Sequence, residues 1–142
     1  MKYEIVIDKE RESLLIISPE RTKLIDRIEE LIRSEHDELV GVSGSTVAVL
    51  EPDRISCFFA LDGRVYAICE GEKYQLKLRL YQLEERYSAS FVKINQSCMV
   101  NTKKIKGFEA SIGGSLMVML DDGYRDYVSR RQLKAVKERI GF

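Results

Sequence analysis

The sequence has few of the residues on which catalytic and metal sites are usually built. It contains one histidine, His36, no tryptophan and three cysteines, Cys57, Cys69 and Cys98. A single histidine leaves little basis for a His-based zinc site or a Ser-His-Asp triad. An odd number of cysteines at irregular spacing predicts reduced, buried thiols in a cytosolic protein rather than a disulfide framework. We therefore expect no metal, no cofactor and no enzymatic activity.

Long apolar segments are also absent. No apolar run approaches the ~20 residues of a transmembrane helix, and the N-terminus MKYEIVIDKERE carries charges throughout, unlike a secretory signal. The chain has 142 residues, of which 44% are hydrophobic and 32% charged. This size and composition predict one globular domain, or one domain with a small appended module, in the cytoplasm.

Charge is balanced overall but unevenly distributed along the chain. Residues 1–53 hold 7 Lys/Arg and 13 Asp/Glu, a net of −6, whereas residues 54–142 hold 16 and 10, a net of +6. A formal net charge of zero argues against a nucleic-acid partner, but the basic C-terminal part favours one. Chance segregation of charge over a solvated surface is the alternative explanation.

The N-terminal third predicts a small strand–helix extension. Residues 2–8 alternate as a strand does, and residues 13–17 form a short apolar run that suits a buried strand end. Residues 18–20, Ser-Pro-Glu, are a helix start signal, and Glu29 and Arg33 are spaced to pair on the outer face of that helix. Its apolar stripe packs either on the extension's own sheet or on a partner, and consists of Leu24, Ile25, Ile28, Leu31 and Ile32.

From residue 38 onward the pattern changes to short strands separated by turns. Residues 79–87 and 130–139 instead carry apolar residues at helical spacing. Glycine-containing turns in series predict an antiparallel sheet, so the expected fold class is α+β, mainly antiparallel β. The break at residues 51–53, Glu-Pro-Asp, divides the chain into an extension, 1–50, and a β domain, 51–142. The turns are expected at Gly44, Asp62-Gly63, Glu70-Gly71, residues 111–114 and Asp121-Asp122-Gly123.

The strongest candidate for a ligand contact is the start of the last predicted helix. Ser129 occupies its capping position, and Arg130 and Arg131 fall in its first turn. Two cations at the positive end of a helix dipole reduce stability, but together with free backbone amides they suit a bound phosphate. Lys134 and Lys137 extend the basic face and suit phosphate contacts. The alternatives are plain solvation of the lysines and pairing of the arginines with Asp121, Asp122 or Asp126.

A second candidate is the polar interruption between two predicted strands at residues 95–97. Asn95 and Gln96 each carry an amide that can pair with adenine in a major groove, and a loop would project them outward. Ordinary turn chemistry explains the same residues. A metal role for His36 among its acidic neighbours lacks a usual ligand spacing. Gly113-Gly114 lacks the lysine and the helix of a phosphate-binding loop.

The two candidate segments lie in a longer pattern. The run FVKINQSCMVNTKKIKGFEA, followed after a hairpin by LMVMLDDGYRDYVSRRQLKAVKERIG, resembles the LytTR DNA-binding domain family. RISCFFALDGRVYAIC and KLRLYQLEERY fit the family's first hairpin and short helix, so that the resemblance covers about residues 50–142. The sequence departs from the family at Asn95-Gln96, where a His-Arg or His-Asn pair is frequent. The matching positions are Phe91, Lys93, Ile94, Ser97, Val100 and Asn101, then Val128, Ser129, Arg130, Arg131, Leu133 and Lys134.

The resemblance implies an elongated β domain that binds double-stranded DNA and regulates transcription in bacteria. Loops enter successive major grooves at direct repeats, usually in a homodimer. By positional matching, Gln96 and Arg131 contact bases, and Arg64 falls near a third contact point. Ser129, at the start of the last helix, is also among the residues expected to bind DNA. The resemblance further implies backbone or supporting contacts by Lys93, Asn95, Asn101, Arg130 and Lys134.

The resemblance also suggests partners for the N-terminal segment. About 50 residues precede the match, too few for the receiver domain that many members carry. The chain is therefore similar to the short, receiver-less members, in which a membrane-embedded inhibitor protein is often the partner. The acidic extension is a candidate for dimer or inhibitor contact. Two rival functions are a module whose basic face binds an acidic protein and a small-molecule binder that uses the interior of the β domain.

Overall fold

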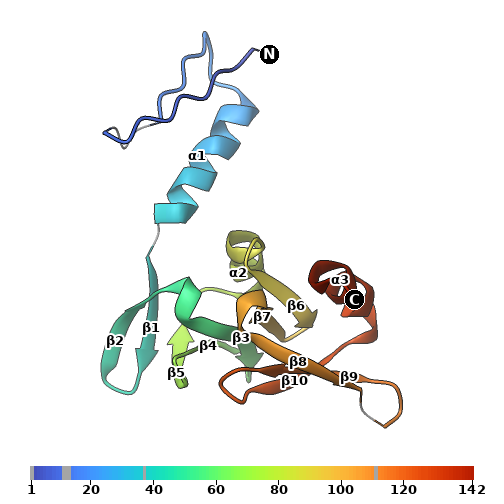
Figure 1. Ribbon diagram of the computed structural model, residues 1–142. Helices are drawn as coiled ribbons and strands as arrows, with labels where there is room; N and C mark the ends of the chain where they lie inside the picture. Colours follow the sequence, from blue (N-terminus) through green and yellow to red (C-terminus); the bar gives the residue numbers. More distant parts are fainter. Residues whose placement is uncertain (1, 11–13, 37, 111) are drawn as a thin grey trace. The chain divides into compact units, whose positions relative to one another are not determined.

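The computed structural model describes residues 2–10, 14–36, 38–110 and 112–142, with the backbone alone for residues 33–36. The chain divides into two compact units, one within residues 1–36 and the other within residues 37–142 (Figure 1). Each unit has its own internal organisation.

The first unit contains one helix, α1 (Lys23–His36), and no strand among its described residues. The predictions of a strand over residues 2–8 and of a buried strand end in the apolar run were wrong for the described part. Residues 2–8 and 14–17 are exposed and without regular structure. A lone segment gains little from adopting a strand, because its backbone groups then lack a partner to pair with.

The α1 helix begins later than the sequence signal predicted. Ser18 does not cap it, because its hydroxyl donates to the Glu20 carbonyl oxygen at 2.7 Å. Thr22 takes the capping role, with its Oγ1 accepting from the Ile25 backbone N–H at 3.3 Å. The helix therefore starts at Lys23, four residues after the proline.

An arginine ahead of the helix organises the charges on its first turns. The Arg21 guanidinium pairs with Asp26 at 2.6 Å and also with Glu29. Glu29 was predicted to pair with Arg33, whose side chain lies outside the described residues. Exposed pairs of this kind contribute only tenths of a kcal/mol each.

The second unit is built from two antiparallel sheets and two helices. The seven-stranded sheet has the order β2-β1-β5-β4-β3-β7-β6, and the three-stranded sheet has the order β10-β9-β8. The helices are α2 (Leu80–Tyr87) and α3 (Arg130–Ile140). The strands are β1 (Leu39–Ser43), β2 (Thr46–Leu50), β3 (Ile55–Leu61), β4 (Arg64–Cys69), β5 (Glu72–Leu76), β6 (Phe91–Asn95), β7 (Cys98–Asn101), β8 (Ile105–Ala110), β9 (Leu116–Leu120) and β10 (Arg125–Val128). The predicted α+β class with mainly antiparallel sheet is confirmed.

The predicted turn signals fall where chains reverse in the structure. Asp62 and Gly63 both adopt positive φ, 51° and 73°, between β3 and β4, as the tight turn requires. Gly141, at φ 95°, ends α3, and its N–H donates to the Lys137 carbonyl oxygen at 2.8 Å. The turn predicted at residues 111–114, of which residue 111 lies outside the described residues, falls between the paired strands β8 and β9.

The compact β unit begins earlier in the chain than the sequence pattern suggested. The β1–β2 hairpin, assigned from the sequence to the extension, pairs with β5 through Gly41↔Leu76 and Val42↔Gln75. The division between the two units falls at residues 36/37, whereas the sequence analysis placed it at 50/51. The break that prompted that boundary is a single 3-10 turn, Pro52–Arg54, which leads directly into β3.

An apolar layer lies on each face of the large sheet (Figure 1). The second layer covers β3, β4, β6 and β7 only, and the valines on that face of the β1–β2 hairpin stay exposed, namely Val40, Val42, Val47 and Val49. Phe58 and Cys57 are adjacent on β3 and point to opposite layers, as strand alternation demands. The first layer includes Phe58, Phe91, Met99 and Leu83 of α2. The second joins the sheet to the three-stranded sheet and α3, and includes Cys57, Ile94, Cys98, Val118, Leu120, Val128 and Val136.

Gly41 marks a close approach within the large sheet. A Cβ atom added there would lie 2.7 Å from Tyr74 Cβ and 2.8 Å from Leu50 Cδ1. We predict that Gly41→Ala lowers the free energy of unfolding by about 1–3 kcal/mol, because backbone and packed side chains must move apart. Urea denaturation measures this change. Ser45→Ala, in the exposed turn of the same hairpin, is the control and should change it by less than about 0.5 kcal/mol. Equal urea midpoints of unfolding for the two variants would contradict close packing at Gly41.

Candidate nucleic-acid interface

Two of the predicted contact segments meet at one end of the large sheet. β3 runs toward the turn at residues 62–63 and pairs antiparallel with β7, which begins just after the turn at residues 96–97. Both turns therefore lie at the same end. The Ala60 N–H donates to the Ser97 carbonyl oxygen at 2.8 Å, which links them directly.

The start of α3 joins the same end through two hydrogen bonds. The Ser129 N–H donates to the Ile94 carbonyl oxygen at 2.8 Å. The Asn95 side-chain Nδ2 donates to the Tyr127 carbonyl oxygen at 2.9 Å. The chain entering α3 is thereby held against the last residues of β6, so the first turn of α3 and the 96–97 turn are neighbours.

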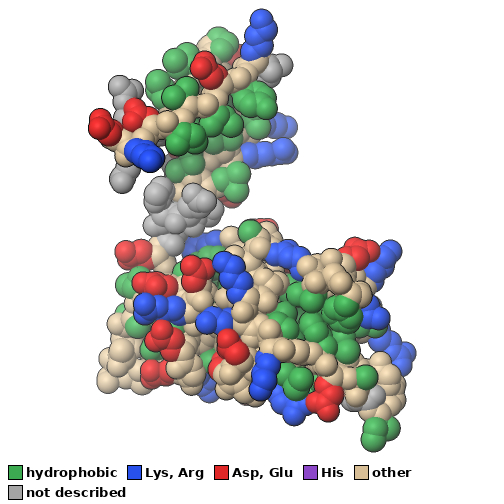
Figure 2. Space-filling view, in the orientation of Figure 1, with side chains coloured by type: hydrophobic (Ala, Val, Ile, Leu, Met, Phe, Trp, Pro, Cys, Tyr) green, Lys and Arg blue, Asp and Glu red, His purple; other side chains and the backbone are tan. Residues whose placement is uncertain are grey.

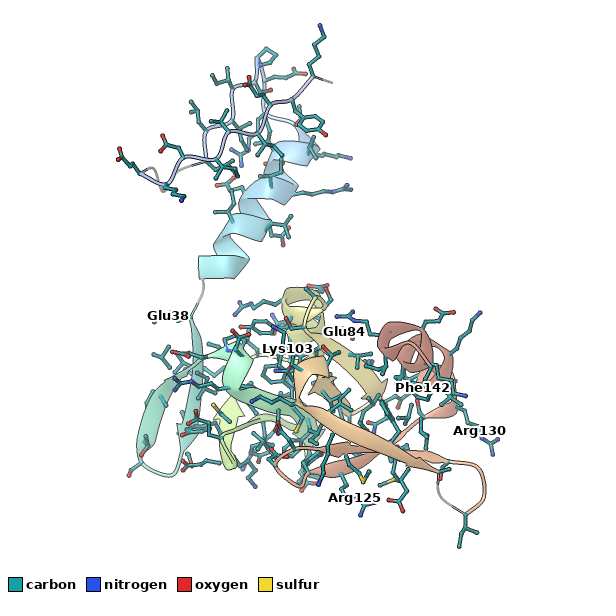
Figure 3. All side chains as sticks on the ribbon, viewed as in Figure 1. Glu38, Glu84, Lys103, Arg125, Arg130 and Phe142 are labelled. Carbon is teal, nitrogen blue, oxygen red and sulfur yellow. The ribbon has the colours of Figure 1, made fainter. Side chains whose placement is uncertain are left out.

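The side chains that these segments carry are open to solvent. Five of the predicted residues are exposed: Arg64, Gln96, Arg130, Arg131 and Lys134. Among the described residues, no carboxylate lies within ion-pair distance of these four cations. Figure 3 shows the Arg130 side chain extending outward from the end of α3. These groups are available to a ligand without breaking any internal pair.

In the described residues, Arg130 and Arg131 form no ion pair with the three aspartates that the sequence offered as partners, Asp121, Asp122 and Asp126. Asp122 instead accepts a hydrogen bond from the buried Ser56 hydroxyl at 2.6 Å and another from the Tyr124 N–H at 3.0 Å. Asp126 accepts from the Tyr124 hydroxyl at 3.3 Å. The Ser129 hydroxyl makes no capping hydrogen bond, so the first turn of α3 has neither a cap nor an acidic residue. Its positive end is uncompensated.

Lys93 is positioned differently from the other cations. It is half-buried on β6, and its Nζ lies 3.7 Å from Glu84 Oε2 on α2. Part of its charge is thus balanced within the domain. Its side chain supports the sheet edge more than it presents a free cation.

Two predicted site residues lie inside the domain, which corrects the expectation that residues 95–97 all project outward. Asn95 is 2% exposed and uses both ends of its amide, since Oδ1 accepts from the Ser97 N–H at 2.9 Å. Asn101 is 1% exposed, with Nδ2 donating to the Ile55 carbonyl oxygen and Oδ1 accepting from the Lys103 N–H. Asn101 sits at the opposite end of β7, so we leave it out of the proposed contact set.

The outer face of α3 extends the basic surface. In Figure 2, Lys and Arg side chains gather along the edge of the second unit that α3 occupies. A shallow, open groove there is lined by Arg130, Lys134, Lys137, Glu138 and apolar atoms of Leu133 and Phe142. The groove is too open to enclose a small molecule, and its lining combines apolar surface with four charged side chains.

Sequence reasoning missed Tyr127. Its side chain is half exposed on β10, and its carbonyl oxygen accepts the Asn95 bond. An aromatic residue in a strand is usually assigned to the core, but the alternation along β10 places Val128 inward and Tyr127 outward. That alternation was the available signal.

The core behind this end of the sheet is uncharged. A hydrogen bond with Cys57, together with burial, raises the pKa of the Cys98 thiol far above its ordinary value. Burial likewise raises the pKa of Tyr124. A protonated, fully buried thiol is neither a nucleophile nor a metal ligand. No group of three or more possible metal ligands occurs in the described residues, and the side chain of His36 lies outside them.

An antiparallel β domain that exposes cations and an amide from two turns and a helix start offers a surface that suits a polyanion such as DNA. Comparison of the sequence with known families assigns the domain to one of them. The profile of the LytTr DNA-binding domain matches residues 45–141. The chain belongs to the LytTR DNA-binding domain family, which is a family of DNA-binding domains and not of enzymes.

Individual relatives agree with this assignment. An uncharacterized HTH-type transcriptional regulator of Staphylococcus aureus strain MSSA476 is 32% identical over 146 residues, covering 99% of this chain and 98% of the relative. Its counterpart in strain COL is 31% identical with the same coverage. The solved LytTr DNA-binding domain of a methyl-accepting/DNA response regulator from Bacillus cereus has the same fold. Its TM-score is 0.69 at 19% identity, covering 75% of this chain and 99% of that domain. In the described part of the chain, no helix has the length and apolar character needed to cross a membrane.

Proposed function

We propose that the protein is a bacterial, cytoplasmic transcription regulator that binds double-stranded DNA sequence-specifically at direct repeats. The 62–63 turn, the 96–97 turn and the start of α3 enter the major groove. The observation that carries the proposal is the convergence of these segments at one end of the sheet through backbone hydrogen bonds, with their cations unpaired in the described residues. The relatives' naming as transcriptional regulators supports the regulatory part.

The exposed residues divide by chemistry into two roles. Gln96 offers a paired donor and acceptor to adenine, and Arg131 offers a bidentate donor to guanine. These two are the proposed base contacts, with Arg64 as a third from the neighbouring turn. The proposed phosphate contacts are Arg130, Lys134 and the Ser129 hydroxyl, because unpaired cations at a helix start favour an anion.

The rival function is a module that binds an acidic protein partner. Such a module would show no preference for one DNA sequence over another. Selection of bound sequences from random duplex DNA tests the proposal directly, because it returns a site and its repeat spacing. Recovery of no enriched sequence would reject specific DNA binding. The interior is an unsuitable small-molecule site, since side chains of the two apolar layers occupy it.

The first unit is the proposed dimer contact. None of its described side chains is buried, and several large apolar residues are well exposed, including Ile7, Leu15 and Ile17 (Figure 2). A single helix of 14 residues is marginal in water unless its apolar face packs against something. We propose that a second copy of the chain supplies that contact. A membrane-embedded inhibitor is the other candidate partner, suggested only by the family resemblance.

We predict that Gln96→Ala and Arg131→Ala each cost about 1–3 kcal/mol in binding to the selected site, because each removes a paired contact to one base. Affinity for random duplex DNA should change little. Fluorescence anisotropy with cognate and random duplexes measures both. Gln75→Ala, an exposed amide on β5, is the matched control and should leave both affinities unchanged. Equal losses on cognate and random DNA would reject base readout by these two residues.

Lys134→Ala should weaken binding to all sequences alike and reduce the slope of log K against log salt by about one, because one phosphate contact is lost. A salt titration on both duplexes measures the slope. Lys73→Ala, an exposed lysine near the opposite end of the sheet, should leave the slope unchanged. A slope that stays the same in Lys134→Ala would remove this residue from the phosphate contacts.

A double substitution on α1, Leu24→Ser with Leu31→Ser, should convert a dimer to a monomer, because both side chains are exposed on the apolar stripe. Analytical ultracentrifugation of the full chain measures the change. Glu30→Gln, on the opposite side of the helix, is the control. A wild-type protein that stays monomeric at high concentration would reject self-association through this unit. If such a monomeric protein were recovered specifically with membranes, the membrane-embedded inhibitor would be favoured as the partner of this unit.

A further inference from the structure

A buried amide connects the two segments that carry the proposed base contacts. Asn95 donates through Nδ2 to the Tyr127 carbonyl oxygen, two residues before the capping position of α3. It accepts through Oδ1 from the Ser97 N–H, on the far side of Gln96. One side chain therefore spans from the 96–97 turn to the strand that leads into α3, at 2.9 Å on each side.

An irregularity in β6 makes this connection possible. The pairing of β6 with β7 shifts between Lys93↔Met99 and Asn95↔Cys98, so Ile94 has no direct partner on β7. Its carbonyl oxygen accepts instead from the Ser129 N–H. A bulge of this kind re-aims the end of a strand, and here it redirects two consecutive residues toward the chain before α3.

The result is that Gln96 is held from both sides while its own side chain stays exposed. Ser97 is fixed by the Asn95 amide on its N–H and by the Ala60 N–H on its carbonyl oxygen. Arg131 follows Ser129 within one helical turn, and Ser129 is tied to Ile94. The offset between Gln96 and Arg131 is therefore set by bonds at Ile94 and Asn95.

We propose that Asn95 is a positioning residue for sequence recognition, which acts through Gln96 and Arg131 and does not touch DNA. This inference rests on the proposed function of those two residues. Base readout requires side chains placed to within about 0.5 Å, and supporting hydrogen bonds are what supply that placement. Phosphate contacts from long, flexible lysines tolerate larger shifts. Loss of the Asn95 amide therefore reduces discrimination between sequences more than it reduces affinity for DNA in general.

The chain offers a matched control in Asn101. It is buried to the same degree, donates at 2.9 Å to a carbonyl oxygen on another strand and accepts from the N–H two residues ahead. It lies at the opposite end of β7, away from the proposed contacts. Asn101→Ala and Asn95→Ala thus remove the same number and kind of hydrogen bonds, and differ in location.

The test compares wild type, Asn95→Ala and Asn101→Ala as full chains, with thermal melts to confirm folding. Affinities are measured for the selected duplex and for random duplex DNA. We expect Asn95→Ala to lower the ratio of cognate to random affinity about tenfold with an unchanged salt slope, and Asn101→Ala to leave the ratio at the wild-type value. A wild-type ratio near one would refute the proposed function itself. A wild-type preference that Asn95→Ala retains in full would refute only the positioning role.

A double-mutant cycle separates positioning from direct contact. If Asn95 acts through Gln96, then Gln96→Ala should cost several-fold less affinity in the Asn95→Ala background than in wild type. Additive losses, with Asn95→Ala also changing the preferred base, would mean that Asn95 turns outward and contacts DNA. Hydrogen exchange on the wild-type protein adds a measurement that needs no variant. The Ser97 amide should exchange as slowly as the Lys103 amide, and rapid exchange would overturn the proposal.

Discussion

The recognition end of this domain depends on the attachment of one strand terminus to the chain that enters α3. The Ser129 N–H and the Asn95 side chain bridge that junction, and they join parts of the sequence about thirty residues apart. Without them, the start of α3 would have no hydrogen bond to β6, and the helix would be held by its apolar side, chiefly Val136, and by Arg139 near its other end, whose guanidinium donates to the Ser88 and Ala89 carbonyl oxygens. Packing of an apolar stripe tolerates sliding, whereas directional hydrogen bonds to carbonyl oxygens do not. The bonds therefore convert a packed helix into one with a defined starting point.

The two apolar layers stabilise the domain without using the side chains at the end of the large sheet, which therefore stay exposed. The apolar layers cover both faces of β3 and β7, so the polar groups of this part of the sheet lie at its ends. Turns at a sheet end expose side chains without disturbing either layer, and β3 and β7 are buried almost throughout. The described chain has no two helices adjacent in sequence, since several strands separate each helix from the next. Although relatives carry a helix-turn-helix designation in their names, the surface described here is built from turns and one helix start.

Much of the β unit could be predicted from local chemistry. Asp62-Gly63 supplies backbone conformations that few residues adopt, so its position indicated the β3–β4 turn. The N-terminal part was harder, because a strand is defined by its partner and residues 2–8 have none among the described residues of their unit. The burial of Asn95 could not be read from the sequence either. An asparagine beside a turn is ordinarily solvated, and only the bulge in β6 and the carbonyl of Tyr127 bring it inside. The boundary at residue 50 followed a proline that the fold accommodates in a short 3-10 turn.

The proposed base contacts are exposed and form no ion pairs within the described residues, and this affects how regulators of this kind can change the operator that they prefer. Gln96, Arg64 and Arg131 carry none of the fold's ion pairs in the described residues, and the backbone beneath them is secured by other groups. Substituting these side chains should leave folding stability nearly untouched while altering which operator is preferred. A duplicated gene could thus acquire a new target through one or two codon changes, with no compensating repair elsewhere in the domain.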